Sequence, residues 1–300
     1  MNKLEYHIHQ ILKKDRQGSF GTQAGRQRTL FLCVKQLHEA GYKVKQMKPE
    51  DLKGRHINAL LKRWQDDGVS VGTIKNRLAN LRWLADKIGN KGLVKSNDEL
   101  GIGKRQYITN KDKGADIAKV DMSQLSPNVS YSVRLQEHFG LRREEAMKFQ
   151  LDYALDGYPA DKVEIIKIKP SWAKGGRYRE IPITSKEQID LLGELEGFFK
   201  AHNLHSLIPN ERSYKEHMKH FENETRAAGI GRTHGLRHLY AQRRYKDLIG
   251  FECPAIDSSR VLTEDEKQKD RQVRMLISEE LGHGRISVTG IYLGSWSLKK

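Results

Sequence analysis

A tyrosine close to the last residue of the chain belongs to a set of residues that could break and rejoin a phosphodiester. Tyr292 follows His283 by nine residues, and a second histidine, His234, lies upstream with Arg142 and Arg237. A tyrosine phenol can attack phosphorus and form a covalent intermediate. Guanidinium groups suit phosphodiester oxygens because they are planar, bidentate and permanently charged. These five residues together indicate DNA cleavage by phosphotyrosyl transfer.

The charge balance of the chain points to a polyanionic partner. Lysine and arginine total 54 against 38 aspartate and glutamate residues, which gives a net charge of +16. The excess is uneven, because residues 1–110 hold 22 basic and 10 acidic side chains. Nucleic acid is the natural partner for such a chain, although a solvated basic surface would give the same count.

Length and composition fit a cytoplasmic protein of two domains. A chain of 300 residues favours two hydrophobic cores over one. No apolar run is long enough to span a bilayer, so no membrane is expected, and the N-terminus lacks the apolar core of a secretory signal. Cys33 and Cys253 are the two cysteines, and they lie far apart, so a disulfide scaffold is not expected.

Helical patterns fill the first third of the chain. Apolar residues at helical spacing predict helices at 29–37, 52–64 and 71–88, with Ser70 as the N-cap of the third. Such a bundle, apolar inside and basic outside, could lie against a duplex. Glycine-rich, polar residues follow and predict a linker, so we place the join near residue 110. Residues 1–110 would form a DNA-binding domain and residues 111–300 a catalytic domain.

The second domain is expected to combine helices with one β-hairpin. The helical patterns lie at residues 127–139, 142–149, 186–202, 214–228 and 234–245. Residues 163–170 and 177–183 are rich in β-branched side chains and predict two strands joined by a tight turn at Gly175-Gly176. That hairpin would present Lys174 at its tip. Residues 246–272 look polar and irregular.

The order and spacing of these motifs resemble those of the tyrosine recombinases, the integrases of phages and mobile elements. The resemblance is strong over residues 139–293 and weaker before them. Family members carry Gly-Leu-Arg-x-x-Glu, a hairpin lysine followed by basic residues and a proline, His-x-x-Arg, and Leu-Gly-His with a tyrosine nine residues on. The matching residues are Gly140, Leu141, Arg142 and Glu145; Lys174, Arg177, Arg179 and Pro182; His234, Arg237 and His238; and Leu281, Gly282, His283 and Tyr292.

The resemblance implies a mainly helical fold with a small antiparallel β-sheet. A helical, SAM-like core-binding domain would precede a catalytic domain that breaks and rejoins DNA. Tyr292 would be the nucleophile and would remain attached to the 3′ phosphate of the cleaved strand. Lys174 would be the general acid that protonates the leaving 5′ oxygen.

The remaining site residues would act on the phosphate itself. Arg142 and Arg237 would clamp its oxygens without losing their protons. His234 and His283 would donate hydrogen bonds to the phosphate or assist proton transfer. Glu145 follows Arg142 by three residues on one helical turn, where it could orient the guanidinium.

The resemblance also implies partners. These are double-stranded DNA attachment sites, accessory DNA-bending proteins and further copies of the chain, because strand exchange between two duplexes needs four subunits. The stretch from Arg237 to His283 is longer than the family pattern, which suggests a surface insertion within 246–272. With only eight residues after it, Tyr292 is expected to be mobile or poorly aligned until DNA and a neighbouring subunit fix it, and the free protein is expected to be a monomer.

Three other interpretations stay open from the sequence. A DNA-binding regulator would have lost active-site residues, a metal-dependent nuclease would need grouped carboxylates, and a type IB topoisomerase would share the chemistry without strand exchange. His234 and His238 have the spacing of a metal-ligand pair, but the accompanying ligands are missing, so no metal or cofactor is expected. His238, Tyr240 and Tyr245 are expected to pack rather than react.

Overall fold

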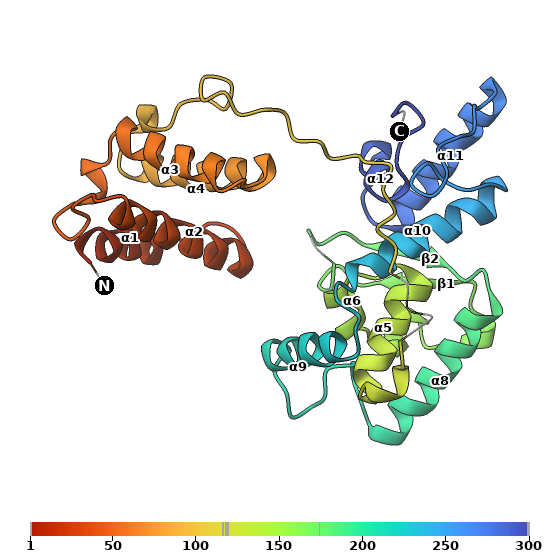
Figure 1. Ribbon diagram of the computed structural model, residues 1–300. Helices are drawn as coiled ribbons and strands as arrows, with labels where there is room; N and C mark the ends of the chain where they lie inside the picture. The colour runs from red at the N-terminus through yellow and green to blue at the C-terminus, as the bar shows by residue number, and fades with distance from the viewer. Residues whose placement is uncertain (1, 116, 118–119, 174, 299–300) are drawn as a thin grey trace. The chain divides into compact units, whose positions relative to one another are not determined.

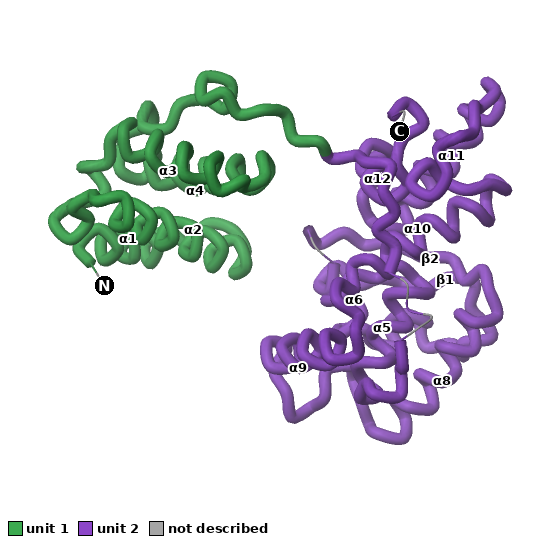
Figure 2. The backbone as a smooth tube through the Cα atoms, in the orientation of Figure 1, with its two compact units in different colours: residues 1–106 green, residues 107–300 purple. Residues whose placement is uncertain are grey.

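The polar segment after residue 94 leads from one unit of the protein, residues 1–106, to a second, residues 107–300 (Figure 2). The structure is a computed structural model that describes residues 2–115, 117, 120–173 and 175–298. Each unit buries its own set of apolar side chains. Each therefore has the core that a separate domain requires.

Unit 1 is a bundle of helices (Figure 1). Its elements are α1 (Lys3–Lys14), α2 (Phe20–Glu39), α3 (Gly54–Asp66) and α4 (Val71–Lys87), with short 3₁₀ turns η1 (Pro49–Asp51) and η2 (Lys91–Leu93). Ser70 caps α4 as predicted, because its hydroxyl accepts a hydrogen bond from the backbone of Thr73 at 3.3 Å. Trp64 is fully buried, and its indole donates to Gln36 at 2.8 Å, which joins α3 to α2 inside the core.

Unit 2 combines helices with a two-stranded antiparallel sheet, which confirms the predicted fold class. Its elements are η3 (Met122–Gln124), α5 (Pro127–Phe139), α6 (Arg143–Met147), α7 (Leu151–Ala154), η4 (Ala160–Lys162), β1 (Ile165–Ile168), β2 (Arg179–Pro182), α8 (Lys186–His202), α9 (Tyr214–Ala227), α10 (His234–Ile249), α11 (Glu264–Glu280) and α12 (Ile286–Leu293). Helix α10 packs against α5, α11 and α12. Helix α10 therefore joins α5 to the two helices that follow it in the chain, α11 and α12.

The connection between β1 and β2 differs from the predicted tight turn. The strands pair from Ile165 opposite Pro182 to Ile168 opposite Arg179, so residues 169–178 form a long loop. Trp172 in this loop is buried among the rings of Phe149 and Tyr153. Burial of this large aromatic side chain stabilises the loop. Lys174, predicted at the tip, lies outside the described residues.

Residues 246–272 were predicted to be an irregular surface insertion, and this prediction is wrong for residues 264–272, which are helical. Helix α11 begins at Glu264. The hydroxyl of Thr263 accepts a hydrogen bond from the backbone of Glu266, and the Glu266 carboxylate accepts one from the backbone of Thr263. The charged run that looked irregular is therefore the first turn of a helix, where acidic residues favour the N-terminal dipole. Further along, Val273 and Ile277 are buried in the core.

Helix α12 does not have the poor alignment expected of a near-terminal segment. Thr289, Gly290, Tyr292 and Leu293 are all buried against α10 and α11. The side chain of Tyr292 is 5% exposed. The nucleophile candidate is therefore part of the packed core.

Candidate active site

Arg142 enters the site from a sharp turn between α5 and α6. Helix α5 ends at Gly140, whose φ of 59° is left-handed, and a Cβ there would lie 2.5 Å from a ring carbon of Tyr240. Both the conformation and the space therefore require glycine. Arg142 follows as the N-cap of α6, and its guanidinium donates to Oε1 of Glu145 at 2.7 Å and to the carbonyl of Leu281 at 3.3 Å.

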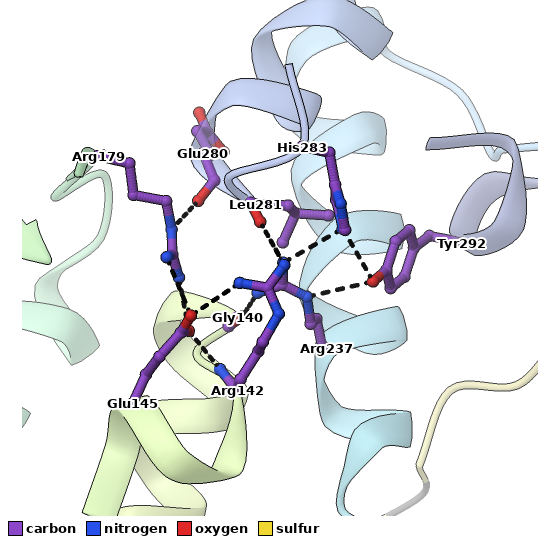
Figure 3. Close-up of polar contacts among 9 residues, drawn as sticks. All are labelled: Gly140, Arg142, Glu145, Arg179, Arg237, Glu280, Leu281, His283 and Tyr292. Atoms are coloured by element: carbon purple, nitrogen blue, oxygen red, sulfur yellow. Dashed lines mark hydrogen bonds and ion pairs between the residues drawn. The ribbon is translucent and has the colours of Figure 1, made fainter. Parts of the chain in front are cut away.

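Arg237 on α10 lies at the centre of the site (Figure 3). Its side chain is 1% exposed and donates to the carbonyls of Gly140 and Leu281. Its Nε lies 3.3 Å from the hydroxyl of Tyr292, and its Nη2 lies 3.4 Å from Nε2 of His283. Burial lowers the pKa of Arg237 to about 10, so the group remains a cation at neutral pH. Two backbone acceptors thus orient one buried cation toward the tyrosine.

The donors of Arg237 also determine the tautomer of His283. An arginine can only donate, so Nε2 of His283 must be an acceptor. The same nitrogen lies 3.2 Å from the oxygen of Tyr292, so the phenol donates a hydrogen bond to it. Burial, helped by the charges of Arg237, Arg142 and Arg179, lowers the pKa of His283 to about 3. A neutral proton acceptor therefore contacts the hydroxyl of Tyr292.

The two histidines of α10 have different surroundings. His234, the first residue of the helix, is solvent-exposed, and its ring centroid lies 6.0 Å from that of Tyr292. Partial burial and the charges of Arg237 and Arg142 lower its pKa. His238 is buried and packs against the ring of Tyr292, with ring centroids 4.7 Å apart and planes tilted by 48°, as expected of a packing residue. Burial lowers the pKa of His238 to about 4.

Glu145 connects two arginines from different elements beneath the site (Figure 3). Its carboxylate is fully buried and contacts Arg142, the contact expected from the sequence. It also accepts hydrogen bonds from Arg179 on β2, at 2.6 Å and 3.1 Å. The Nε of Arg179 donates to the carbonyl of Glu280 at 2.8 Å. One negative charge thus lies among the closely spaced cations of the site.

Sequence reasoning did not select Arg179 as a site residue. The signal was present in the alternation of the second strand, which places Arg179 and Ile181 on the same face. Since Ile181 must be buried, the arginine on the same face had to be buried too, and a buried arginine needs hydrogen-bond acceptors. The buried pairing of Glu280 with Arg244 on α10 was not predicted either.

Acid should destabilise the protein through Glu145. Burial alone would raise the pKa of this carboxyl, but hydrogen bonds from Arg179 and the charges of Arg179, Arg237 and Arg142 hold it at about 2. A free glutamate has a pKa of about 4.3. Because the folded-state pKa is the lower one, the stabilisation is complete above about pH 4.3 and is lost as the pH falls toward 2. We expect this group to account for about 3 kcal/mol of the free energy of unfolding.

Denaturant unfolding between pH 7 and pH 2.5 measures this effect on the wild type and on Glu145→Gln. The variant should be less stable at pH 7 by about 3–5 kcal/mol, because an uncompensated cluster of buried arginines remains. Its stability should also fall less steeply with acid. Glu194→Gln, which breaks an exposed pair with Arg134, serves as the matched control. Parallel pH profiles for the wild type and Glu145→Gln would contradict the assignment.

A basic cleft adjoins the site. It has a volume of about 460 Å³, and the residues lining it include Arg142, Arg143, Arg226, Arg232 and His234. The cleft therefore presents four guanidinium groups, one of which, that of Arg143, pairs with Glu222, and it shares Arg142 and His234 with the site. A phosphate backbone is a suitable occupant for a cleft of this charge.

The structure brings together the candidate site residues that it describes. They are Arg142, Glu145, His234, Arg237, His283 and Tyr292. Lys174 is outside the described residues. Within those residues, no group of three or more His, Cys, Asp or Glu side chains could hold a metal ion. No helix in the described part of the chain is long and apolar enough to cross a membrane.

A helical unit is followed by a mainly helical unit in which two arginines, two histidines and a tyrosine meet, and two of these residues also line a basic cleft. This arrangement defines a tyrosine-dependent DNA strand-transfer protein. A family profile described as "Phage integrase, N-terminal" matches residues 1–94, and one described as "Integrase" matches residues 104–243. The chain belongs to the phage integrase family of tyrosine recombinases. His283 and Tyr292 lie beyond the matched residues, so their assignment depends on spacing and on the contacts above.

Several solved structures have this fold. A lambda integrase dimer bound to a COC′ core site has a TM-score of 0.60 at 14% identity, over 99% of this chain and 97% of that chain. XerH recombinase in a post-cleavage complex with palindromic difH has a TM-score of 0.57 at 16% identity, over 97% and 81%. The Tn1549 transposon integrase with circular intermediate DNA has a TM-score of 0.54 at 12% identity, over 98% and 96%. No curated protein sequence matches the chain.

Proposed function

We propose that this integrase is a site-specific recombinase that cleaves and rejoins DNA through a covalent link between Tyr292 and a 3′ phosphate. One observation carries the proposal: the hydroxyl of Tyr292 contacts Nε of Arg237 at 3.3 Å and Nε2 of His283 at 3.2 Å. The cation favours the phenolate, and the neutral imidazole can accept its proton. An oxygen held in this way is prepared to attack phosphorus.

The proposed cleavage step involves two proton transfers. The phenolic proton passes to Nε2 of His283 while the oxygen of Tyr292 forms a bond to phosphorus. The bond from phosphorus to the 5′ oxygen breaks, and Lys174 gives the leaving oxygen its proton. The phosphotyrosine retains the bond energy, so the reverse step can rejoin a strand without ATP.

Arg142 and Arg237 would stabilise the charge that develops on the phosphate oxygens. Each guanidinium carries five N–H donors. Contacts with the described part of the chain use two donors of Arg142 and four of Arg237, so Arg142 retains more donors for a substrate than Arg237 does. Donors held in advance by backbone acceptors need no reorganisation during the reaction. The exposed His234 at the first turn of α10 would add a further hydrogen bond.

A nicked suicide substrate tests the proposal directly. Cleavage near a nick releases a short 5′-hydroxyl fragment and traps the enzyme on the 3′ phosphate. The adduct should form in excess EDTA, because arginines and a lysine replace a metal cation in this scheme.

Rejoining of one duplex to another, rather than simple relaxation of supercoils, separates a recombinase from a topoisomerase. A regulator with an inactive site would bind DNA and form no adduct.

The partners proposed for this chain follow from its family and its charge. The lambda integrase and XerH structures hold DNA sites, and the Tn1549 structure holds the circular intermediate of a transposon. We propose that this protein integrates or excises a mobile element at paired attachment sites, with accessory DNA-bending proteins as further partners. Unit 1, residues 1–106, would grip the duplex, because much of the excess basic charge precedes residue 110.

Assembly should depend on DNA. The net charge of +16 disfavours association of free subunits, and a polyanion removes that repulsion. We expect a monomer in light scattering of the free protein and a tetramer when two duplex sites are present. A stable tetramer without DNA would show that the subunits associate through a surface that does not require charge neutralisation.

Lys174 should be needed only to protonate the leaving 5′ oxygen. Lys174→Ala should slow cleavage by about 10²–10⁴-fold, the usual range for a general acid. A 5′-bridging phosphorothiolate leaves without a proton, so this substrate should restore much of the rate. His283→Ala is the matched contrast, because His283 acts on the attacking oxygen and its loss should not be rescued. Equal behaviour of the two variants on the phosphorothiolate would remove Lys174 from the acid role.

A further inference from the structure

The segment that joins the two units is bound to the end of the nucleophile helix. Residues 108–115, here called the strap, belong to unit 2 and run beside α12 before reaching α10 (Figure 1). The side chain of Asn110 makes three hydrogen bonds to the chain just after α12. Its Oδ1 accepts from the backbone of Ser295 at 2.8 Å, and its Nδ2 donates to the carbonyls of Ser295 at 3.0 Å and Leu298 at 2.8 Å.

Two glycines let the strap approach this closely. A Cβ on Gly290, within α12, would lie 2.7 Å from Cδ1 of Ile108. A Cβ on Gly294 would lie 2.6 Å from Oδ1 of Asn110 and 2.8 Å from the backbone nitrogen of Ala255. A larger residue at Gly290 would displace the side chain of Ile108, and one at Gly294 would collide with Asn110 and with the backbone of Ala255. The side of α12 next to the strap is therefore matched to it in shape.

The strap also connects α12 to α10, the helix that carries Arg237. Oδ1 of Asp112 accepts a hydrogen bond at 3.0 Å from Nε2 of Gln242, a buried residue of α10. That Nε2 also lies 3.5 Å from the carbonyl of Tyr292. The backbone of Ala115 then donates to the carbonyl of Gly235 at 3.1 Å. The strap therefore touches both helices whose spacing determines the contact between Tyr292 and Arg237.

Helix α12 needs such support. It has 8 residues, and a helix of that length is unstable without tertiary contacts. The hydroxyl of Tyr292 must nevertheless stay within hydrogen-bond distance of two groups on other elements for attack to be efficient.

We propose that Asn110 and Asp112 are positioning residues for Tyr292. The strap holds the end of α12 against α10 and so sets the distance from the tyrosine hydroxyl to Arg237 and His283. Because the strap continues into unit 1, the segment that connects the DNA-binding unit also aligns the nucleophile. This inference rests on the proposed function of Tyr292 as the attacking group.

Single-turnover formation of the covalent adduct by the full chain, at saturating suicide substrate, tests the inference. Asn110→Ala should lower the rate constant by about 10- to 100-fold, the effect of a misplaced reacting group, with unchanged DNA affinity. Asp112→Ala should show a smaller loss. Asp112→Asn keeps the acceptor oxygen for Gln242 and should retain the wild-type rate. Asn223→Ala, an exposed position on α9, is the matched control.

The amplitude of the reaction separates positioning from folding. A variant that is partly unfolded loses adduct amplitude, whereas the remaining molecules react at the wild-type rate. A positioning defect lowers the rate constant and keeps the amplitude. Wild-type rate constants for both Asn110→Ala and Asp112→Ala, or a loss of amplitude alone, would overturn the inference. Absence of adduct from the wild-type protein would instead reject the proposed function of Tyr292.

Discussion

Tyr292→Phe should bind DNA as the wild type does and form no covalent adduct. The phenyl ring fills the same space, so the ring contact with His238 and the packing of α12 are retained. The hydroxyl that lies between Arg237 and His283 is lost, and with it the only atom placed to attack phosphorus in this scheme. We therefore expect complete loss of cleavage, the largest effect of any single change in the chain.

A denaturing gel of the nicked suicide substrate gives the result, and a filter or mobility assay measures binding beside it. Tyr240→Phe is the matched control, because its hydroxyl is also buried but donates to Glu280 at 2.8 Å. That control should still form an adduct. An adduct that survives in Tyr292→Phe would mean that a different nucleophile performs the reaction.

Replacement of Arg237 should have the second largest effect. Its guanidinium contacts the carbonyls of Gly140 and Leu281, the hydroxyl of Tyr292 and Nε2 of His283 at once. Arg237→Lys keeps a positive charge, but one ammonium cannot reach four acceptors that suit a planar fork. We expect a loss of about 10³-fold or more in the single-turnover rate, comparable to removal of an arginine from a phosphoryl-transfer site.

Two measurements separate an effect on catalysis from a loss of stability or a general effect of removing an arginine. Thermal unfolding of Arg237→Lys identifies any loss of stability from the two buried carbonyls. Arg243→Ala, on the same helix, removes an arginine that pairs with Glu137 and is more than half exposed, and should leave the rate near that of the wild type. Near-normal cleavage by Arg237→Lys would show that this site needs only a charge at position 237.

Local features of unit 2 were predictable because they depend on residues that are close together in the sequence. Pro127 begins α5, and Gly140 ends it in a left-handed conformation, as the residue types indicate. The start of α11 was missed although Thr263 and Glu266 form a capping box. There the polar composition masked a helix whose buried face has only a few apolar residues.

The alignment of Tyr292 was not predictable from its position near the last residue. Nearness to a terminus suggested a loosely held side chain, but Asn110, some 185 residues earlier in the chain, binds the segment that follows α12. The loop after β1 was mispredicted for a similar reason. Gly175 and Gly176 have the positive φ expected of the turn, but Trp172 is buried against Phe149 and Tyr153, and residues 177 and 178 lie outside the second strand, in which they were expected. In both cases a distant contact outweighed a local preference.

The sequence by itself determined which residues could do chemistry, since order and spacing were enough to select Arg142, His234, Arg237, His283 and Tyr292. Only the tertiary structure decided how they act. It paired Arg179 with Glu145, assigned the acceptor nitrogen of His283, and placed the strap against α12. Buried charges must find partners wherever packing brings them. The contacts of Arg179 with Glu145 and of Arg237 with Gly140 join residues 34 and 97 positions apart, so no local pattern records them.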